Sequence, residues 1–430
     1  MCLAGLLSAS CGTEGIDLHP VLEHFKVGAN LPIGWVELGP HSAWIARVIT
    51  NDEICPSLMV DSAEVHTTLR AKPNEHFPIH VCEATISPHA KQIHLGKKEL
   101  PVPKKDPQRI LVIGDTGCRI SKYVKKAQGC NTPESWPFPS IALEAARLKP
   151  DLVIHTGDIV YREQACPEGD HSCAGSPYGQ NWKTWESDFF IPAEPLLAEA
   201  PWVVARGNHE DCPRNWEGWF KFLDPGHYTE GHCTPASEPY WVNIGDNQLV
   251  VADSSNLNGK SDPQEVHRVT TLFHQVEKIS SQHSNGSDRW FLTHSPIWAF
   301  EDEESGSQPG EPKLTALHAA ADKTFLNEFQ LALAGHVHTF LGLSFDDPYT
   351  SQFIVGNGGT SLTPLPDKIT ASDFGDRKIK NSTIWNDFGF MMLEKHGDRW
   401  NGKVYDRRGQ VVISCKIHKS QIDCAKVTEN

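Results

Sequence analysis

The sequence predicts an α/β (α+β) protein in which a mixed α/β region follows an all-β, sandwich-like region. Between residues 36 and 96, short runs of alternating or β-branched residues are separated by turn residues, and no helical period persists. After residue 108, continuous apolar runs end in Gly, Asp, Asn or His, which is typical of strands covered on both faces. Helix-like stretches lie between some of these runs, for example at 140–148 and 270–279.

The chain is long enough for two domains, since it has 430 residues. We expect a signal remnant at 1–20, a β-sandwich-like domain at 21–96 and an α/β domain at 109–430. Three prolines and four lysines in residues 97–108 indicate a linker between the two domains. The last runs, from residue 388 onward, predict an antiparallel meander rather than further βα units.

Composition and charge limit the kinds of partner. The formal net charge of −15 argues against nucleic-acid binding, because an acidic surface repels phosphate backbones. A phosphorylated substrate remains compatible with this charge, since bound cations reverse its sign locally. No apolar run is long enough to predict a transmembrane segment.

The first residues and the cysteines favour export to a secreted or periplasmic location. Met1–Ser10 is apolar with small residues, like the end of a secretory signal, and the following Cys11 is a candidate for lipid attachment. Ten further cysteines lie near one another in sequence as Cys55/Cys82, Cys118/Cys130, Cys166/Cys173, Cys212/Cys233 and Cys415/Cys424. Their even number predicts disulfides in an oxidising compartment, against the alternative of reduced thiols in a cytosolic enzyme. Sequence leaves the pairing open.

Polar residues follow five of the apolar runs after residue 108, where the carboxyl edge of a sheet forms a site. They are Asp115 in GDTG, Asp158 and Tyr161 in GDIVY, Asn208 and His209 in GNHE, His294 in LTHSP, and His336 and His338 in GHVH. Oxygen and imidazole donors of this kind suit first-row metal ions. Each short motif is common by itself, but the ordered set of five predicts a metal site.

The order and residue patterns of these segments resemble the motifs of the calcineurin-like metallophosphoesterase superfamily, and within it those of the purple acid phosphatases. The resemblance covers roughly residues 109–338. It implies a four-layer sandwich of two mixed β-sheets flanked by helices, with the metals at the strand ends. Many purple acid phosphatases also carry an N-terminal β-sandwich, which agrees with the first hundred residues here.

One position separates subfamilies. Many members of the superfamily have Asp-x-His in the first motif, with the His as a metal ligand, whereas this chain has Gly117 there. Tyr161 stands three residues after Asp158, and this GDxxY spacing is the purple-phosphatase pattern, in which the tyrosinate binds Fe(III). A Tyr after a strand is usually a packed core residue, but the missing His favours the ligand interpretation.

The resemblance implies two metal ions, Fe(III) and a divalent ion (Fe, Zn or Mn). The first would be held by Asp115, Asp158, Tyr161 and His338. The second would be held by Asp158, Asn208, His294 and His336. Asp158 would bridge the two ions, and a hydroxide bound to them would attack phosphorus. His209 is the candidate catalytic residue that contacts phosphate and protonates the leaving oxygen, and Glu210 is a candidate to orient it.

Hydrolysis of small phosphate monoesters, of the acid-phosphatase type, is the activity these residues predict. A phosphodiesterase acting on nucleotides or lipid headgroups with the same metals is the alternative. A non-catalytic binding module is a third interpretation, which the intact ligand set disfavours. Oligomeric state is not predicted.

Other candidates have simpler explanations. Asp253 and Asn357 follow strands, but chain turns explain them equally well. His155 lacks a motif and is expected to be structural. Residues 164–185 and 299–312 are loops that could shape a substrate pocket. Asn285 and Asn381 head N-x-S/T sequons.

Overall fold

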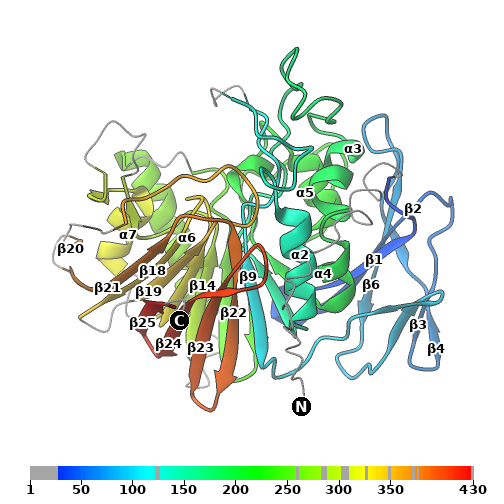
Figure 1. Cartoon of the computed structure of the whole chain (residues 1–430). Helices are drawn as coiled ribbons and strands as arrows, with labels where there is room; N and C mark the ends of the chain where they lie inside the picture. The colour runs from blue at the N-terminus through cyan, green and yellow to red at the C-terminus, as the bar shows by residue number, and fades with distance from the viewer. Residues whose placement is uncertain are drawn as a thin grey trace, which may run out of the picture.

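Two mixed β-sheets stacked face to face form the centre of the computed structural model (Figure 1). The structure describes residues 28–427 except 122–125, 258–260, 282–287, 302–308, 325–327, 347–349, 368, 370–372 and 375–376. The predicted signal remnant with Cys11 and the sequon at Asn285 lie outside the described residues.

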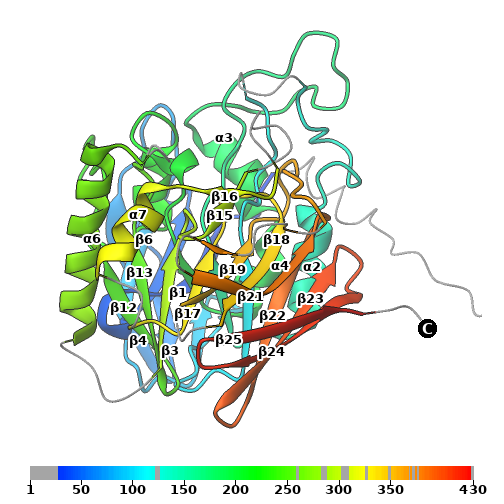
Figure 2. The same cartoon turned by 90° about the vertical axis from the view of Figure 1, so that its left-hand side faces the viewer.

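The first sheet has eleven strands. In spatial order they are β25 (Gln421–Lys426), β24 (Val411–His418), β23 (Arg399–Asp406), β22 (Gly389–His396), β9 (Arg109–Ile113), β10 (Leu152–His155), β11 (Trp202–Val204), β1 (Ile33–Leu38), β2 (Trp44–Thr50), β6 (His80–Ile86) and β5 (Thr68–Ala71). β9, β10, β11 and β1 are parallel neighbours, and β22 joins β9 in antiparallel. The antiparallel C-terminal meander β22–β25 is confirmed, and Figure 2 shows it at the end of the first sheet, away from α6.

The second sheet has eight strands. Their order is β12 (Tyr240–Ile244), β13 (Asn247–Ala252), β14 (Arg289–Thr293), β17 (Leu331–Ala334), β19 (Ser351–Val355), β18 (Phe340–Phe345), β21 (Arg377–Trp385) and β20 (Asp373–Phe374). β13, β14, β17 and β19 are parallel. A further hairpin joins β15 (Ala299–Phe300) to β16 (Pro312–Lys313).

Helices cover the outer face of each sheet, so that four layers result (Figure 1). The helices are α2 (Phe138–Arg147), α3 (Trp182–Trp185), α4 (Glu194–Glu199) and α5 (Trp216–Phe222) beside the first sheet, and α6 (Pro263–Ser281) and α7 (Ala316–Thr324) beside the second. Short helical turns are η1 (Pro40–Ser42), η2 (Glu186–Phe190) and η3 (Asn208–Glu210). The predicted helices at 140–148 and 270–279 are therefore confirmed as parts of α2 and α6.

The apolar runs are continuous because both faces of each central strand are buried. In β9, Ile110 and Val112 face the core between the sheets, whereas Leu111 and Ile113 face α2 and α4. This alternation follows from the two-residue period of a strand. The predicted four-layer α/β fold is confirmed.

The strand-rich N-terminal region is also confirmed, and half of its strands extend the first sheet. β1 pairs in parallel with β11, and β2, β6 and β5 follow it outward. A separate small sheet, β4 (Ala63–Val65), β3 (Leu58–Val60), β7 (Ile93–Leu95) and β8 (Lys98–Leu100), packs against β1, where a Cβ on Gly34 would lie 2.9 Å from Leu95. β8 lies inside the segment predicted as a linker. The division into domains at 21–96, 97–108 and 109–430 stays a prediction.

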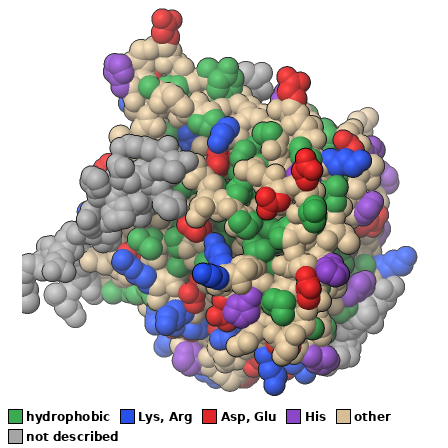
Figure 3. Space-filling view, turned by 90° about the vertical axis from the view of Figure 1, so that its right-hand side faces the viewer, with side chains coloured by type: hydrophobic (Ala, Val, Ile, Leu, Met, Phe, Trp, Pro, Cys, Tyr) green, Lys and Arg blue, Asp and Glu red, His purple; other side chains and the backbone are tan. Residues whose placement is uncertain are grey.

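Five disulfides join the cysteine neighbours in the described residues: Cys55–Cys82, Cys118–Cys130, Cys166–Cys173, Cys212–Cys233 and Cys415–Cys424. They indicate an extracellular or otherwise oxidising compartment. None of the described helices has the length and apolarity needed to cross a membrane. On the face drawn in Figure 3, Lys and Arg side chains are interspersed with Asp and Glu.

Candidate metal centre

All the predicted ligands lie at the carboxyl ends of parallel strands, where the two sheets meet. Asp115 follows β9, and Asp158 and Tyr161 follow β10, while Asn208 and His209 follow β11. From the second sheet, His294 follows β14, and His336 and His338 follow β17. The structure therefore brings all eight predicted site residues together at one edge of the sheets. The sequence separations are large: the His336 amide donates to Asp115 Oδ2 at 3.0 Å, although the two residues are 221 positions apart.

A first group of donors surrounds the phenol of Tyr161. Its hydroxyl lies 2.8 Å from Asp115 Oδ1, 2.8 Å from Asp158 Oδ2 and 3.0 Å from His338 Nε2. Burial, with the two carboxylates, raises the pKa of Tyr161 well above its ordinary value. His338 Nδ1 lies 2.8 Å from the Ser361 carbonyl. Only an N–H can donate to a carbonyl, so the lone pair of His338 is on Nε2 and faces the phenol.

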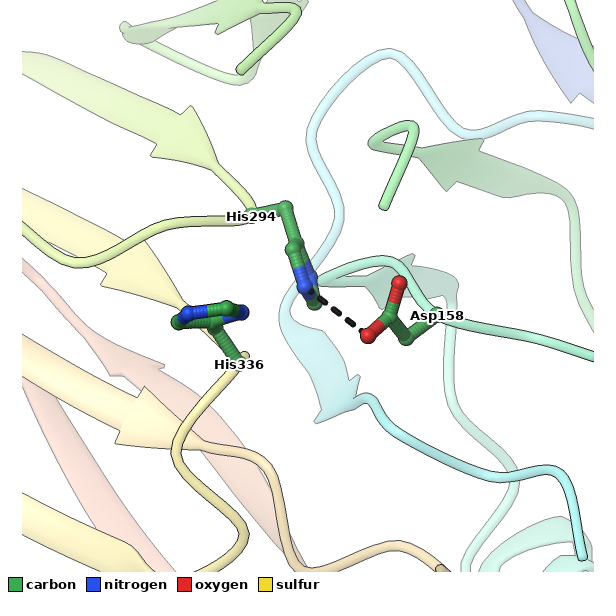
Figure 4. Close-up of side chains that lie close together, drawn as sticks. All are labelled: Asp158, His294 and His336. Carbon is green, nitrogen blue, oxygen red and sulfur yellow. Dashed lines mark ion pairs between the residues drawn. The ribbon is translucent and has the colours of Figure 1, made fainter. Parts of the chain in front are cut away.

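A second group shares Asp158. His294 Nε2 lies 3.1 Å from Asp158 Oδ2 and 3.1 Å from Asn208 Oδ1, and His336 Nδ1 lies 2.8 Å from the same Asn208 oxygen. Figure 4 shows Asp158, His294 and His336 turned toward one another, and their ligand atoms all lie within 4.8 Å. His294 Nδ1 lies 2.9 Å from the Thr156 carbonyl, which again leaves Nε2 as the lone-pair nitrogen.

The donor set fits cations. Asn208 Oδ1 lies 3.1 Å from His294 Nε2 and 2.8 Å from His336 Nδ1, so oxygen and imidazole donors of the kind that bind first-row metal ions converge on one point. Asp115, Asp158 and His336 have positive φ angles of 54°, 57° and 69°. Such backbone conformations are uncommon for residues other than glycine and gather at functional sites. We therefore expect these groups to hold metal ions when they are supplied.

Gly117 has no room for the ligand that other superfamily members carry. A Cβ at this position would lie 2.5 Å from the Ile159 carbonyl oxygen and 2.9 Å from the Tyr161 amide nitrogen. The loop that carries Tyr161 thus occupies the space beside Gly117. Asp188, which sequence reasoning missed, fixes this contact, because its buried carboxylate accepts from the amides of Cys118 at 3.2 Å and Tyr161 at 3.0 Å.

His209 is held by Glu163, not by Glu210. Its Nδ1 lies 2.9 Å from Glu163 Oε1, its amide donates to Asp158 Oδ1 at 2.8 Å, and its ring packs 3.9 Å from that of Tyr161. The expectation that Glu210 orients His209 is wrong. The Glu210 carboxylate turns away and accepts from the amides of Ile159 at 2.8 Å and Val160 at 3.0 Å. Burial and the nearby Asp158 raise the pKa of Glu210 to about 8.

The ligands open into a cleft of about 650 Å³. Its apolar lining residues are Leu257, Pro296, Ala299, Phe300, Leu317 and Val337. Three cationic side chains, Arg119, Arg214 and Lys313, also line it. Of the two loops predicted to shape a pocket, the described part of 299–312 contributes and 164–185 does not.

The weaker candidates are structural. Asp253 pairs with the buried Arg206 at 3.2 Å and accepts from the Ser237 amide at 2.7 Å. Asn357 donates to the Asp387 carbonyl at 2.7 Å. His155 lies behind the site, with Nε2 3.1 Å from Thr116 Oγ1. None of the three lines the cleft.

Comparison with known proteins agrees with this geometry. The family model described as calcineurin-like phosphoesterase matches residues 108–340, which is more than half of the chain. The chain belongs to the calcineurin-like phosphoesterase family. This calcineurin-like phosphoesterase contains a candidate metal site at the strand ends, and phosphoester hydrolysis is the chemistry of its family.

Solved structures share the fold at low sequence identity. A purple acid phosphatase from yellow lupin (Lupinus luteus) seeds matches with a TM-score of 0.53 and 16% identity, covering 90% of this chain and 74% of the lupin chain. PhoD matches with a TM-score of 0.50 and 12% identity, covering 94% of this chain and 92% of its own. A search of curated protein sequences gives no match. At such identities the structural likeness shows the fold alone.

Proposed function

We propose that this calcineurin-like phosphoesterase is a phosphate monoesterase of the purple acid phosphatase type, with Fe(III) and a divalent ion (Fe, Zn or Mn). The observation that carries the proposal is the contact of the Tyr161 hydroxyl with Asp115, Asp158 and His338, beside a glycine where a histidine would otherwise bind. Phenolate is a hard oxygen donor suited to a trivalent ion. Metal binding would release the phenolic proton, which burial and the carboxylates otherwise retain.

The proposed ligands divide into two sets that share Asp158. The first set is Asp115, Asp158, Tyr161 and His338, and the second is Asp158, Asn208, His294 and His336. When bound, the two ions would supply an activated hydroxide and offset the negative charge of the phosphate. Asp158 joins the sets because its Oδ2 faces Tyr161 at 2.8 Å on one side and His294 at 3.1 Å on the other.

His209 is the proposed general acid. It lines the cleft and is not a member of either ligand set, and its Nε2 lies 3.9 Å from Asp158 Oδ2. Glu163 at Nδ1 fixes the orientation of the ring. As the phosphorus–oxygen bond breaks, His209 would donate a proton to the leaving alcohol oxygen.

The disulfides support a secreted or periplasmic location for this activity. Lipid attachment at Cys11 is part of the same proposal.

The test compares p-nitrophenyl phosphate with its bis ester on metal-loaded protein. We expect the monoester to be turned over with the higher kcat/KM, and Asp158→Ala to abolish the turnover of both. A clear preference for the bis ester would make the protein a phosphodiesterase, and absence of turnover of either ester would refute the hydrolase assignment.

A further inference from the structure

The three cations of the cleft are not equivalent. Arg214 is already neutralised by Asp211, with contacts of 3.0 and 2.8 Å, and Lys313 lies 3.7 Å from Glu301. Within the part of the chain that the structure describes, Arg119 has no carboxylate partner, and its Nε has no hydrogen-bond partner at all. An uncompensated guanidinium in a partly buried cleft is costly unless an anion binds there.

Arg119 stands directly beside the first ligand set. Its Nη1 lies 3.5 Å from His338 Nδ1, and its Cζ lies 6.0 Å from the centre of the Tyr161 ring. The guanidinium is therefore next to the proposed metal position without being a ligand, since arginine has no lone pair to donate. A phosphate that enters the cleft toward the metals passes within reach of this group.

The backbone of Arg119 is fixed in this place. Its amide donates to the side chain of Gln128 at 2.8 Å, and its carbonyl accepts from the Gln128 amide at 2.9 Å. The neighbouring Cys118 is bonded to Cys130, which closes the same loop. A cation on a closed loop is preorganised, and less conformational entropy is lost when it binds an anion.

We propose that Arg119 determines the preference for monoesters by binding the third non-bridging oxygen of the phosphate. This inference rests on the proposed function. A diester has two non-bridging oxygens and one negative charge, which two metal ions would satisfy when bound. A monoester dianion presents a third oxygen with a second charge, for which Arg119 is the uncompensated partner. A guanidinium binds such oxygens with strong, charge-assisted hydrogen bonds.

The experiment measures kcat/KM for p-nitrophenyl phosphate and bis(p-nitrophenyl) phosphate on metal-loaded wild type, Arg119→Met and Arg119→Lys. Both esters have the same leaving group, so their ratio reports recognition of the third oxygen. We expect Arg119→Met to lower monoester kcat/KM about 100-fold and diester kcat/KM less than about 5-fold, with Arg119→Lys intermediate. Lys126→Met, which removes an exposed charge from the same loop outside the cleft, is the matched control.

Calorimetric titration with inorganic phosphate gives a readout independent of turnover. We expect Kd to rise about 10-fold or more in Arg119→Met and to stay unchanged in Lys126→Met. If the wild type prefers the monoester and Arg119→Met lowers both esters equally, or neither, the assignment of Arg119 is overturned while the proposed function stands. If the metal-loaded wild type cleaves neither ester, or prefers the diester, the proposed function itself has failed.

Discussion

Glu163 and His209 form a partly buried pair beside the proposed metal ligands, with Glu163 Oε1 2.9 Å from His209 Nδ1. The two atoms are in close contact without the alignment of a linear hydrogen bond. The ring is also held by packing against Tyr161. This arrangement is that of a general acid and its orienting carboxylate.

Replacement of either partner should matter most for poor leaving groups. p-Nitrophenolate leaves without a proton, whereas an alkoxide must be protonated as it leaves. We expect His209→Asn and Glu163→Gln to slow kcat about 100-fold for glycerol phosphate and less than about 10-fold for p-nitrophenyl phosphate. Glu168→Gln, which changes an exposed carboxylate of the following loop, is the control. Equal losses for the two substrates would argue against acid catalysis by His209.

The close packing at Gly117 predicts a loss of stability on substitution. Gly117→Ala places a methyl group 2.5 Å from the Ile159 carbonyl oxygen, so the Tyr161 loop must shift. We expect a decrease of about 1–3 kcal/mol in the free energy of unfolding, measured by denaturant titration, with weaker metal binding. Gly96→Asn serves as the control, because its site is open and its φ of +59° suits Asn. Unchanged stability in Gly117→Ala would contradict the packing argument.

A buried contact between a carboxyl and a guanidinium outside the candidate metal site predicts pH-dependent stability. Glu37 Oε1 lies 2.6 Å from Arg47 Nη1, and burial raises the pKa of Glu37 from its ordinary 4.5 to about 7, although Arg47 opposes the shift. The folded state therefore holds this proton more tightly than the unfolded state. The resulting stability is fully present below pH 4.5 and is lost as the pH rises through 7.

Glu37→Gln, which cannot ionise, isolates this contribution. The free energy of unfolding of the wild type relative to Glu37→Gln should fall by about 2–3 kcal/mol between pH 5 and 8, as urea titrations would show. A difference that rises with pH over this interval would mean that Glu37 is ionised in the fold.

Sequence was sufficient for the layers and for the set of polar residues that meet at the strand ends. The apolar runs that precede Asp115 and Asp158 predicted buried parallel strands, and the same strands place these residues at one sheet edge. It was not sufficient for the pairing of β1 with β11, because no residue pattern near Glu37 or near Trp202 indicates that these two positions are partners in the sheet. Pairing between strands distant in sequence depends on the whole sheet.

Glu163 and Arg119 were missed for a related reason. Glu210 adjoins His209 in sequence, but the helical turn η3 directs its carboxylate beneath the Asp158 loop, and the spatial neighbour of His209 comes from five residues after Asp158. Arg119 follows the first motif directly, so the sequence shows a cation next to that motif. The sequence does not show that this cation lacks a carboxylate partner among the described residues, because charge compensation depends on which residues are neighbours in the fold.

Metal content and the visible spectrum of Tyr161→Phe test the central claim most directly. The wild type, loaded with iron and a divalent ion, should bind two metal ions per chain and absorb visible light through tyrosinate-to-iron charge transfer. Tyr161→Phe should lose this absorption while retaining the ligands Asp115, Asp158 and His338. A wild-type protein that is colourless yet fully metallated and active would contradict the assignment of Tyr161 as a ligand to Fe(III).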